Sequence, residues 1–193
     1  MTYNTLIFSI AIFAFCSWIF KSLKLRFVLA SLITLLCNLP LILSLSVTQW
    51  LDSVCGNPSL FLALLSIGSL LSLPRNPLAS YFLPMHSKHL SLSNASKIYL
   101  VIFGFILFWG NINYLWGFDP FNASFSTQIL FASLITAIGY LIQPYLGFLL
   151  LFSMVGAFFR EGSIFALMMD ALVWLYALLS LLCGVFVRRR DEK

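Results

Sequence analysis

The chain has 193 residues, of which 61% are hydrophobic and only 9% are charged, and its mean hydropathy is +1.00. A soluble domain carries about 25% charged residues, so this composition excludes an ordinary water-soluble globule and predicts one all-α integral membrane domain over residues 1–193. The net charge of +5 is expected from basic residues gathered at the cytoplasmic face, and no basic stripe with interleaved aromatic residues indicates a nucleic-acid partner.

Two apolar runs begin the chain, and each predicts a membrane-spanning helix. The first, residues 5–20, has no Lys or Arg before it, which favours a retained span with its N-terminus outside over a cleaved signal peptide. The second, residues 27–49, has full spanning length. Asn38 lies near its middle and Pro40 follows, so a polar side chain and an interrupted backbone are expected at membrane depth.

The third and fourth predicted spans flank the longest loop of the chain. Asn57 before Pro58 is expected to cap the start of a short third span that ends near Leu73. Residues 74–97 then form the most polar stretch, which we interpret as the longest cytoplasmic loop. The fourth span, residues 99–116, has polar residues toward its outer end.

The uncharged run at residues 128–159 is too long for one ordinary crossing. As a single helix its 32 residues would measure roughly 48 Å, whereas the hydrocarbon core is about 30 Å thick. Gln143 and Pro144 stand near its middle, and proline disfavours helix in the residue before it. The run therefore predicts two short helices joined by a tight turn, with one kinked or re-entrant segment as the alternative.

The last predicted span, residues 163–187, precedes the basic tail at residues 188–193. Counting residues 128–159 as two crossings gives seven spans, with the N-terminus outside and the C-terminus in the cytoplasm. Six spans are the alternative, but they would export the basic tail, against the positive-inside rule. In the seven-span arrangement Arg160 is the one basic residue outside, and the cytoplasmic ones are Lys21, Lys24, Arg26, Arg75, Lys88, Lys97, Arg188, Arg189, Arg190 and Lys193.

Four polar residues within the predicted spans are the main candidates for a solute or ion pathway. Asp170 is the strongest, because a charge roughly 10 Å into a span must face protein or water and find a partner. Asn38, Asn111 and Asn113 are expected to line the same path. The structural alternative is that Asp170 makes a helix-packing hydrogen bond to one of these asparagines, since polar side chains commonly join membrane helices.

Gln143, His86 and His89 are the remaining candidates. Gln143 belongs to the second helix interruption, and paired interruptions can mark a transporter site. His86 and His89 have the spacing of two ligands on one helix face, but no third ligand is nearby, and a pair of titrating surface residues is the simpler interpretation. The sequence predicts no catalytic residue, no metal site and no cofactor.

These patterns leave three hypotheses for function. The first is a small transporter, permease subunit or channel in the plasma or bacterial inner membrane, with Asp170 as its coupling or selectivity group. The second is a non-catalytic assembly or scaffold subunit, whose partners are the lipid bilayer and other membrane subunits or a second copy. The third, an enzyme acting on a lipid-linked substrate, ranks last, because such sites gather several acids, histidines or arginines at one interface.

Overall fold

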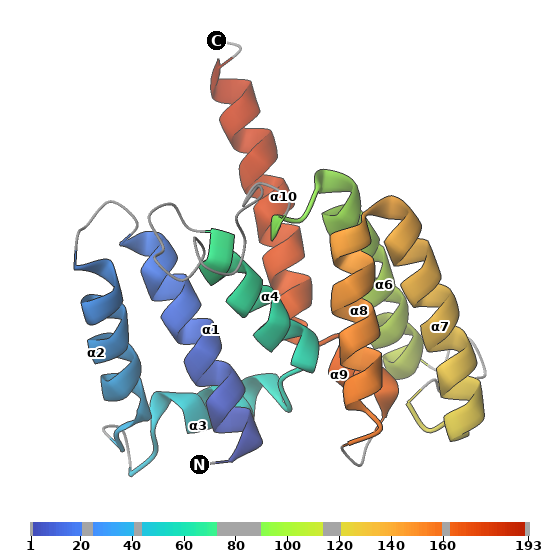
Figure 1. The fold of residues 1–193 in the computed structure, drawn as a ribbon, viewed down its shortest axis with the longest axis horizontal. Coiled ribbons are helices and arrows are strands. Elements are labelled where there is room, and N and C mark those ends of the chain that lie inside the picture. The colour runs from blue at the N-terminus through green and yellow to red at the C-terminus, as the bar shows by residue number, and fades with distance from the viewer. Residues whose placement is uncertain are drawn as a thin grey trace. The chain divides into compact units, whose positions relative to one another are not determined.

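The computed structural model of the chain is built from helices (Figure 1), which confirms the predicted all-α class. It divides into two compact units, Met1–Ser91 and Leu92–Lys193, and each is described by itself. Residues 109–113 and 185–191 are described by their backbone alone. The residues that the structure describes are 2–20, 25–40, 44–72, 90–113, 121–159 and 163–191.

The first unit is organised around helix α1, which lies between α2 and α4 while α3 crosses its N-terminal turns (Figure 1). Apolar side chains hold these helices together: Phe13 of α1 stacks on Phe27 of α2 with ring centroids 6.3 Å apart, and Phe8 and Phe61 are almost completely buried. The helix bounds are α1 (Tyr3–Ile19), α2 (Arg26–Asn38), α3 (Val47–Cys55) and α4 (Leu60–Ser72).

The predicted second span, residues 27–49, is wrong beyond Asn38. Helix α2 ends there, and Leu39 is extended, with φ −80° and ψ 145°, because a residue before proline avoids the helical region. A separate helix, α3, begins after Ser46, whose hydroxyl accepts from the Gln49 backbone while the Gln49 side chain accepts from the Ser46 backbone. This reciprocal capping box fixes the start of a new element inside the apolar run.

The N-cap of helix α4 lies at Ser59, two residues after the predicted cap at Asn57, and the helix starts at Leu60. The hydroxyl of Ser59 accepts a 3.0 Å hydrogen bond from the backbone N–H of Leu62, so Ser59 supplies the cap. The Asn57 side chain accepts instead from Asn4 of α1, at 2.8 Å. The expectation of an Asn57 cap is therefore corrected, because this amide joins two segments of the unit.

The second unit contains an α7–α8 hairpin, a short α9 that contacts both of those helices, and α10 packed on α6. The indole N–H of Trp174 in α10 donates to the carbonyl of Val101 in α6 at 3.0 Å. A Cβ at Gly104 of α6 would meet the Trp174 ring, so this contact requires a small residue. The helix bounds are α6 (Asn94–Asn113), α7 (Phe125–Ile142), α8 (Pro144–Gly156), α9 (Ile164–Met168) and α10 (Ala171–Asp191).

The long apolar run at residues 128–159 forms two helices, as the sequence predicts. Gln143 is extended between them, with φ −157° and ψ 122°, and Pro144 opens α8. The helices approach closely where Gly147 faces Tyr140: a Cβ on Gly147 would lie 2.5 Å from the Tyr140 Cα. Whether both helices cross a membrane stays a prediction.

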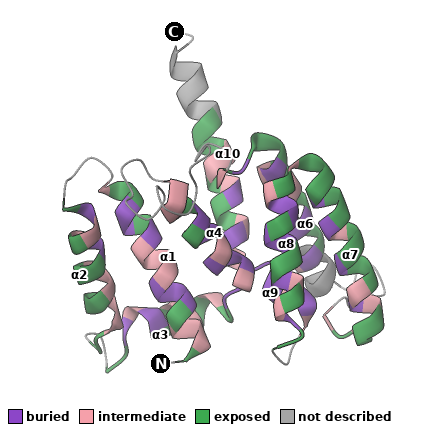
Figure 2. Ribbon diagram, in the orientation of Figure 1, coloured by how far each residue is buried: buried purple, intermediate pink, exposed green. Residues whose placement is uncertain are grey.

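The outer faces of the helices expose many large apolar side chains, seen as green stripes along α2 and α7 (Figure 2). Among the residues whose side chains are described, α7 is the one helix that is both long and apolar enough to cross a membrane by itself. Six further apolar helical segments have 10–17 residues with described side chains, among them Asn94–Phe108 of α6 and Ala171–Gly184 of α10. The seven-span arrangement therefore remains a prediction, although an apolar helix lies in each predicted span.

Candidate functional site

Asp170 lies at a break between two helices and not inside one continuous span. Met169 is extended, with φ −149° and ψ 133°, and separates α9 from α10. The Asp170 carboxylate Oδ1 accepts a 2.7 Å hydrogen bond from the backbone N–H of Val173, and its carbonyl accepts from the Trp174 N–H at 3.1 Å. The expectation of an unbroken helix over residues 163–187 is corrected, because Asp170 is the N-cap of α10.

This geometry gives the acid of the last apolar run a local structural role. Asp170 is buried, and Met168 and Val173 beside it are completely buried. The first N–H groups of a helix lack partners within it and carry partial positive charge, which favours a carboxylate at this place. At Oδ1 the described partner of Asp170 is a backbone N–H. A bond from Asp170 to Asn111 or Asn113 stays a prediction, because those two side chains lie outside the described residues.

Asn38 joins three helices of the first unit. Its Nδ2 donates to Ser9 Oγ of α1 at 2.9 Å and to the carbonyl of Thr34 at 2.9 Å. Its Oδ1 accepts from Thr48 Oγ1 of α3 at 3.2 Å. The described contacts thus support an alternative to the pathway interpretation of Asn38, namely that its amide joins the end of α2 to α1 and α3.

A second pair of polar side chains extends these contacts along α3. Asn4 Nδ2 donates to Asp52 Oδ1 at 2.7 Å. We call Asn4, Ser9, Asn38, Thr48 and Asp52 the α1–α3 polar cluster. Asp52 was not among the candidate residues predicted from the sequence. The signal was the four-residue spacing of Thr48 and Asp52, which places both on one helix face.

Gln143 fastens the α7–α8 junction to the start of α6. Its Oε1 accepts from the backbone N–H of Ser93 at 2.9 Å and from Ser96 Oγ at 2.6 Å. Both partners are in the segment that begins α6, so the side chain holds the hairpin turn against a neighbouring helix end. These contacts describe a packing role for Gln143.

Gln128 is the polar residue of the second unit that sequence reasoning missed. It is buried in the first turn of α7. Its Oε1 accepts from the Ile164 N–H at 2.9 Å and from Ser163 Oγ at 3.2 Å, while its Nε2 donates to the carbonyls of Phe121 and Ala123 at 3.0 and 2.9 Å. One amide therefore joins the starts of α7 and α9.

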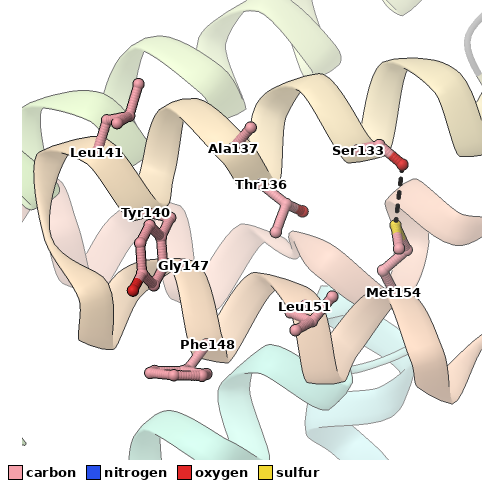
Figure 3. A pocket seen from close by; sticks show the side chains of 9 residues that line it. All are labelled: Ser133, Thr136, Ala137, Tyr140, Leu141, Gly147, Phe148, Leu151 and Met154. Carbon is pink, nitrogen blue, oxygen red and sulfur yellow. Dashed lines mark hydrogen bonds between the residues drawn. The ribbon is translucent and has the colours of Figure 1, made fainter.

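A groove of about 450 Å³ runs along the α7–α8 hairpin (Figure 3). Its polar contact is a 3.9 Å bond from Ser133 Oγ to Met154 Sδ, and none of its lining residues is charged. The candidates Asp170 and Gln143 are not among the lining residues, which are Ser133, Thr136, Ala137, Tyr140, Leu141, Gly147, Phe148, Leu151 and Met154. The groove offers apolar surface and no acid or base.

The structure describes the other four candidate residues only in part or not at all. His86 and His89 lie outside the described residues, and Asn111 and Asn113 are placed on α6 by their backbone alone. Among residues whose side chains are described, no three of His, Cys, Asp or Glu are grouped as they would be around a metal ion. Asn38 belongs to the first unit and Asp170 to the second.

Comparisons with protein-family models, with curated proteins and with solved structures found no significant match. The roles of the side chains therefore have to be taken from their contacts.

Proposed function

We propose that the chain is a multi-pass membrane protein with seven crossings that serves as a non-catalytic assembly or scaffold subunit of a larger membrane complex. One observation carries the choice of function: the amide side chains of Asn38, Gln128 and Gln143, within or beside the apolar segments, bond to the chain itself. Asn38 and Gln128 each make hydrogen bonds with several segments of their own unit. Such bonds hold helices together and leave the outward apolar faces for lipid and partner subunits.

The exposure of α7 supports a bilayer as the solvent. Only 22% of its apolar 18-residue window is buried, whereas an apolar helix in a soluble protein is buried in the core. In water, apolar surface left exposed is less favourable than the same surface in an apolar environment by roughly 25 cal/mol for each Å². Lipid removes that penalty, and the 9% of charged residues in the whole chain point the same way.

The short helices fit seven crossings only if the bilayer or the flanking residues adapt. Helix α2 has 13 residues, roughly 20 Å, against a core about 30 Å thick. Local thinning and snorkelling of flanking basic side chains accommodate such helices at a modest cost per ångström. The basic residues around residues 21–26 and 188–193 would then face the cytoplasm.

Purification in mild detergent tests the scaffold role. We expect the tagged chain to elute with a partner protein in fixed ratio and to lose that partner when an exposed apolar face is changed. Leu134→Ser and Ile138→Ser on α7, both exposed, are the interface variants, and the same changes at Leu32 and Leu36 of α2 are the matched control. Elution of the wild-type chain alone, as one monodisperse species, would contradict the scaffold proposal.

A transporter is the second candidate, and the helix break at Asp170 favours it. Broken helices at membrane depth often bind substrates or ions in transporters. The test is Asp170→Asn, because asparagine is as good an N-cap as aspartate and removes only the charge. Loss of solute uptake in a variant that still inserts and folds would favour the transporter over the scaffold.

A further inference from the structure

Helix α3 turns Thr48 and Asp52 toward α1 and α2 and Trp50 and Val54 outward, and its polar residues Gln49 and Ser53 are exposed as well. Thr48 is completely buried and bonds to Asn38, and Asp52 bonds to Asn4. Trp50 is 37% and Val54 is 78% exposed, and their four-residue spacing places them on the opposite face. On a water-soluble protein the amphipathic helix has the reverse arrangement, with its apolar stripe toward the core. The surroundings that suit Trp50 and Val54 are therefore apolar, whereas the exposed Gln49 and Ser53 suit a polar medium.

The direction of α3 limits what it can do in a bilayer. It lies across the first turns of α1, while α1 and α2 run side by side (Figure 1). The contacts agree, since its polar face reaches both Asn4 and, through Asn38, Ser9. Its nine residues measure roughly 14 Å, too short to cross. If α1 spans the membrane, α3 lies near the membrane plane at the level where α1 begins.

The exposed residues match the chemistry of the boundary between headgroups and acyl chains. Tryptophan is enriched at that depth, because its ring is apolar and its N–H is polar. An amphipathic helix lying in the interface buries its apolar side chains only a few ångströms into the acyl region. Val54 provides the apolar neighbour of Trp50, and the one acid of α3, Asp52, is turned toward Asn4. No charge of α3 therefore opposes contact with lipid.

We propose that α3 is an in-plane interfacial helix whose Trp50 and Val54 side chains insert into the outer leaflet, while the α1–α3 polar cluster holds its other face to α1 and α2. The inference rests on the proposed membrane location, and it names the lipid surface as the partner of this face. It also explains why a polar cluster lies at this level: the cluster sets the angle at which α3 leaves the bundle.

Spin-label accessibility tests the assignment. Val54→Cys, in full-length protein whose four native cysteines are replaced by alanine, carries a nitroxide in phosphatidylcholine vesicles. Leu32→Cys, near the middle of α2 and 54% exposed, is the matched control for the acyl region. We expect the ratio of oxygen to water-soluble nickel accessibility at position 54 to lie between that at position 32 and that of a label free in water.

The outcomes separate the two proposals. A ratio at position 54 equal to that in water, with position 32 still lipid-like, would overturn the interfacial helix and leave the membrane location standing. A label at position 54 that is immobile and reached by neither reagent would also overturn it, because a protein surface would then cover α3. Water-like ratios at both positions would refute the membrane location itself.

Discussion

The carboxylate of Asp170 accepts a 2.7 Å hydrogen bond from the backbone N–H of Val173, and this bond caps helix α10. An isolated charge deep in an apolar run is costly, but a helix N-terminus supplies N–H donors and a favourable dipole. The break before Asp170 is what creates that N-terminus. The acid and the interruption of the helix are thus parts of one feature.

Replacing Asp170 separates capping from charge. We expect Asp170→Ala to lower the free energy of unfolding by about 1 kcal/mol, the usual effect of losing an N-cap. Asp170→Asn keeps the cap and should lose less. Reversible unfolding in mixed micelles, followed by circular dichroism, measures both. Equal losses in the two variants would show that the charge, and not the cap, stabilises this segment.

Gly147 should tolerate no larger side chain. Its Cβ would lie 2.5 Å from the Tyr140 Cα, so Gly147→Ala must push α7 and α8 apart, and overpacking of this kind costs about 1–3 kcal/mol. Gly184→Ala is the matched control, because open space surrounds that position in α10 and alanine is the better helix former. We expect the thermal unfolding temperature to fall for Gly147→Ala and to rise for Gly184→Ala. A Gly147→Ala variant as stable as wild type would contradict the close approach.

Gln128 should control the local stability of the start of α9. Gln128→Leu removes the acceptor of the Ile164 N–H and the donor to Phe121 and Ala123. Each buried group left without a partner costs about 1–3 kcal/mol, so the Ile164 amide should exchange with solvent many-fold faster. Hydrogen exchange read by mass spectrometry over residues 163–170 tests this, with residues 144–156 as the internal reference. Unchanged exchange at Ile164 would contradict the assigned contact.

The Asn38–Thr48 bond should make a small but measurable contribution to stability. In a double-mutant cycle with Asn38→Ala and Thr48→Val, we expect a coupling of about 0.6 kcal/mol, the average for hydrogen bonds between membrane helices. Ser53→Ala on α3 is the control partner, since its hydroxyl bonds within its own helix at 3.0 Å. A coupling of zero for the first pair would remove Thr48 from the α1–α3 polar cluster.

The features predictable from sequence were those with local causes. The division at Gln143 follows from a proline and the length of its apolar run, both visible without a structure. The sequence prediction missed the end of α2 at Asn38, although Pro40 indicates it. Apolar residues continue on both sides of Pro40, so hydropathy alone suggested one span. The Ser46–Gln49 capping box shows that a short motif can override such continuity.

The polar contacts were harder to predict, because their partners lie far apart in the chain. Gln128 bonds to Ile164, 36 positions away, and Asn4 bonds to Asp52, 48 positions away. Only the packing of helices brings such residues together, and a periodic pattern does not specify which helices meet. Asp170 was judged by its depth in an apolar run, and its role as a cap depended on a helix break that no proline or glycine marks.

The most direct test of the membrane proposal is labelling of single cysteines in intact cells with a membrane-impermeant maleimide. Cysteines replace Gln143, Arg160 and Lys193 one at a time in a background without native cysteines. Seven crossings predict external labelling at position 160, with positions 143 and 193 labelled only after the cells are permeabilised. External labelling at position 193 would contradict seven crossings, and recovery of the chain in the soluble fraction without detergent would contradict a membrane protein of any topology.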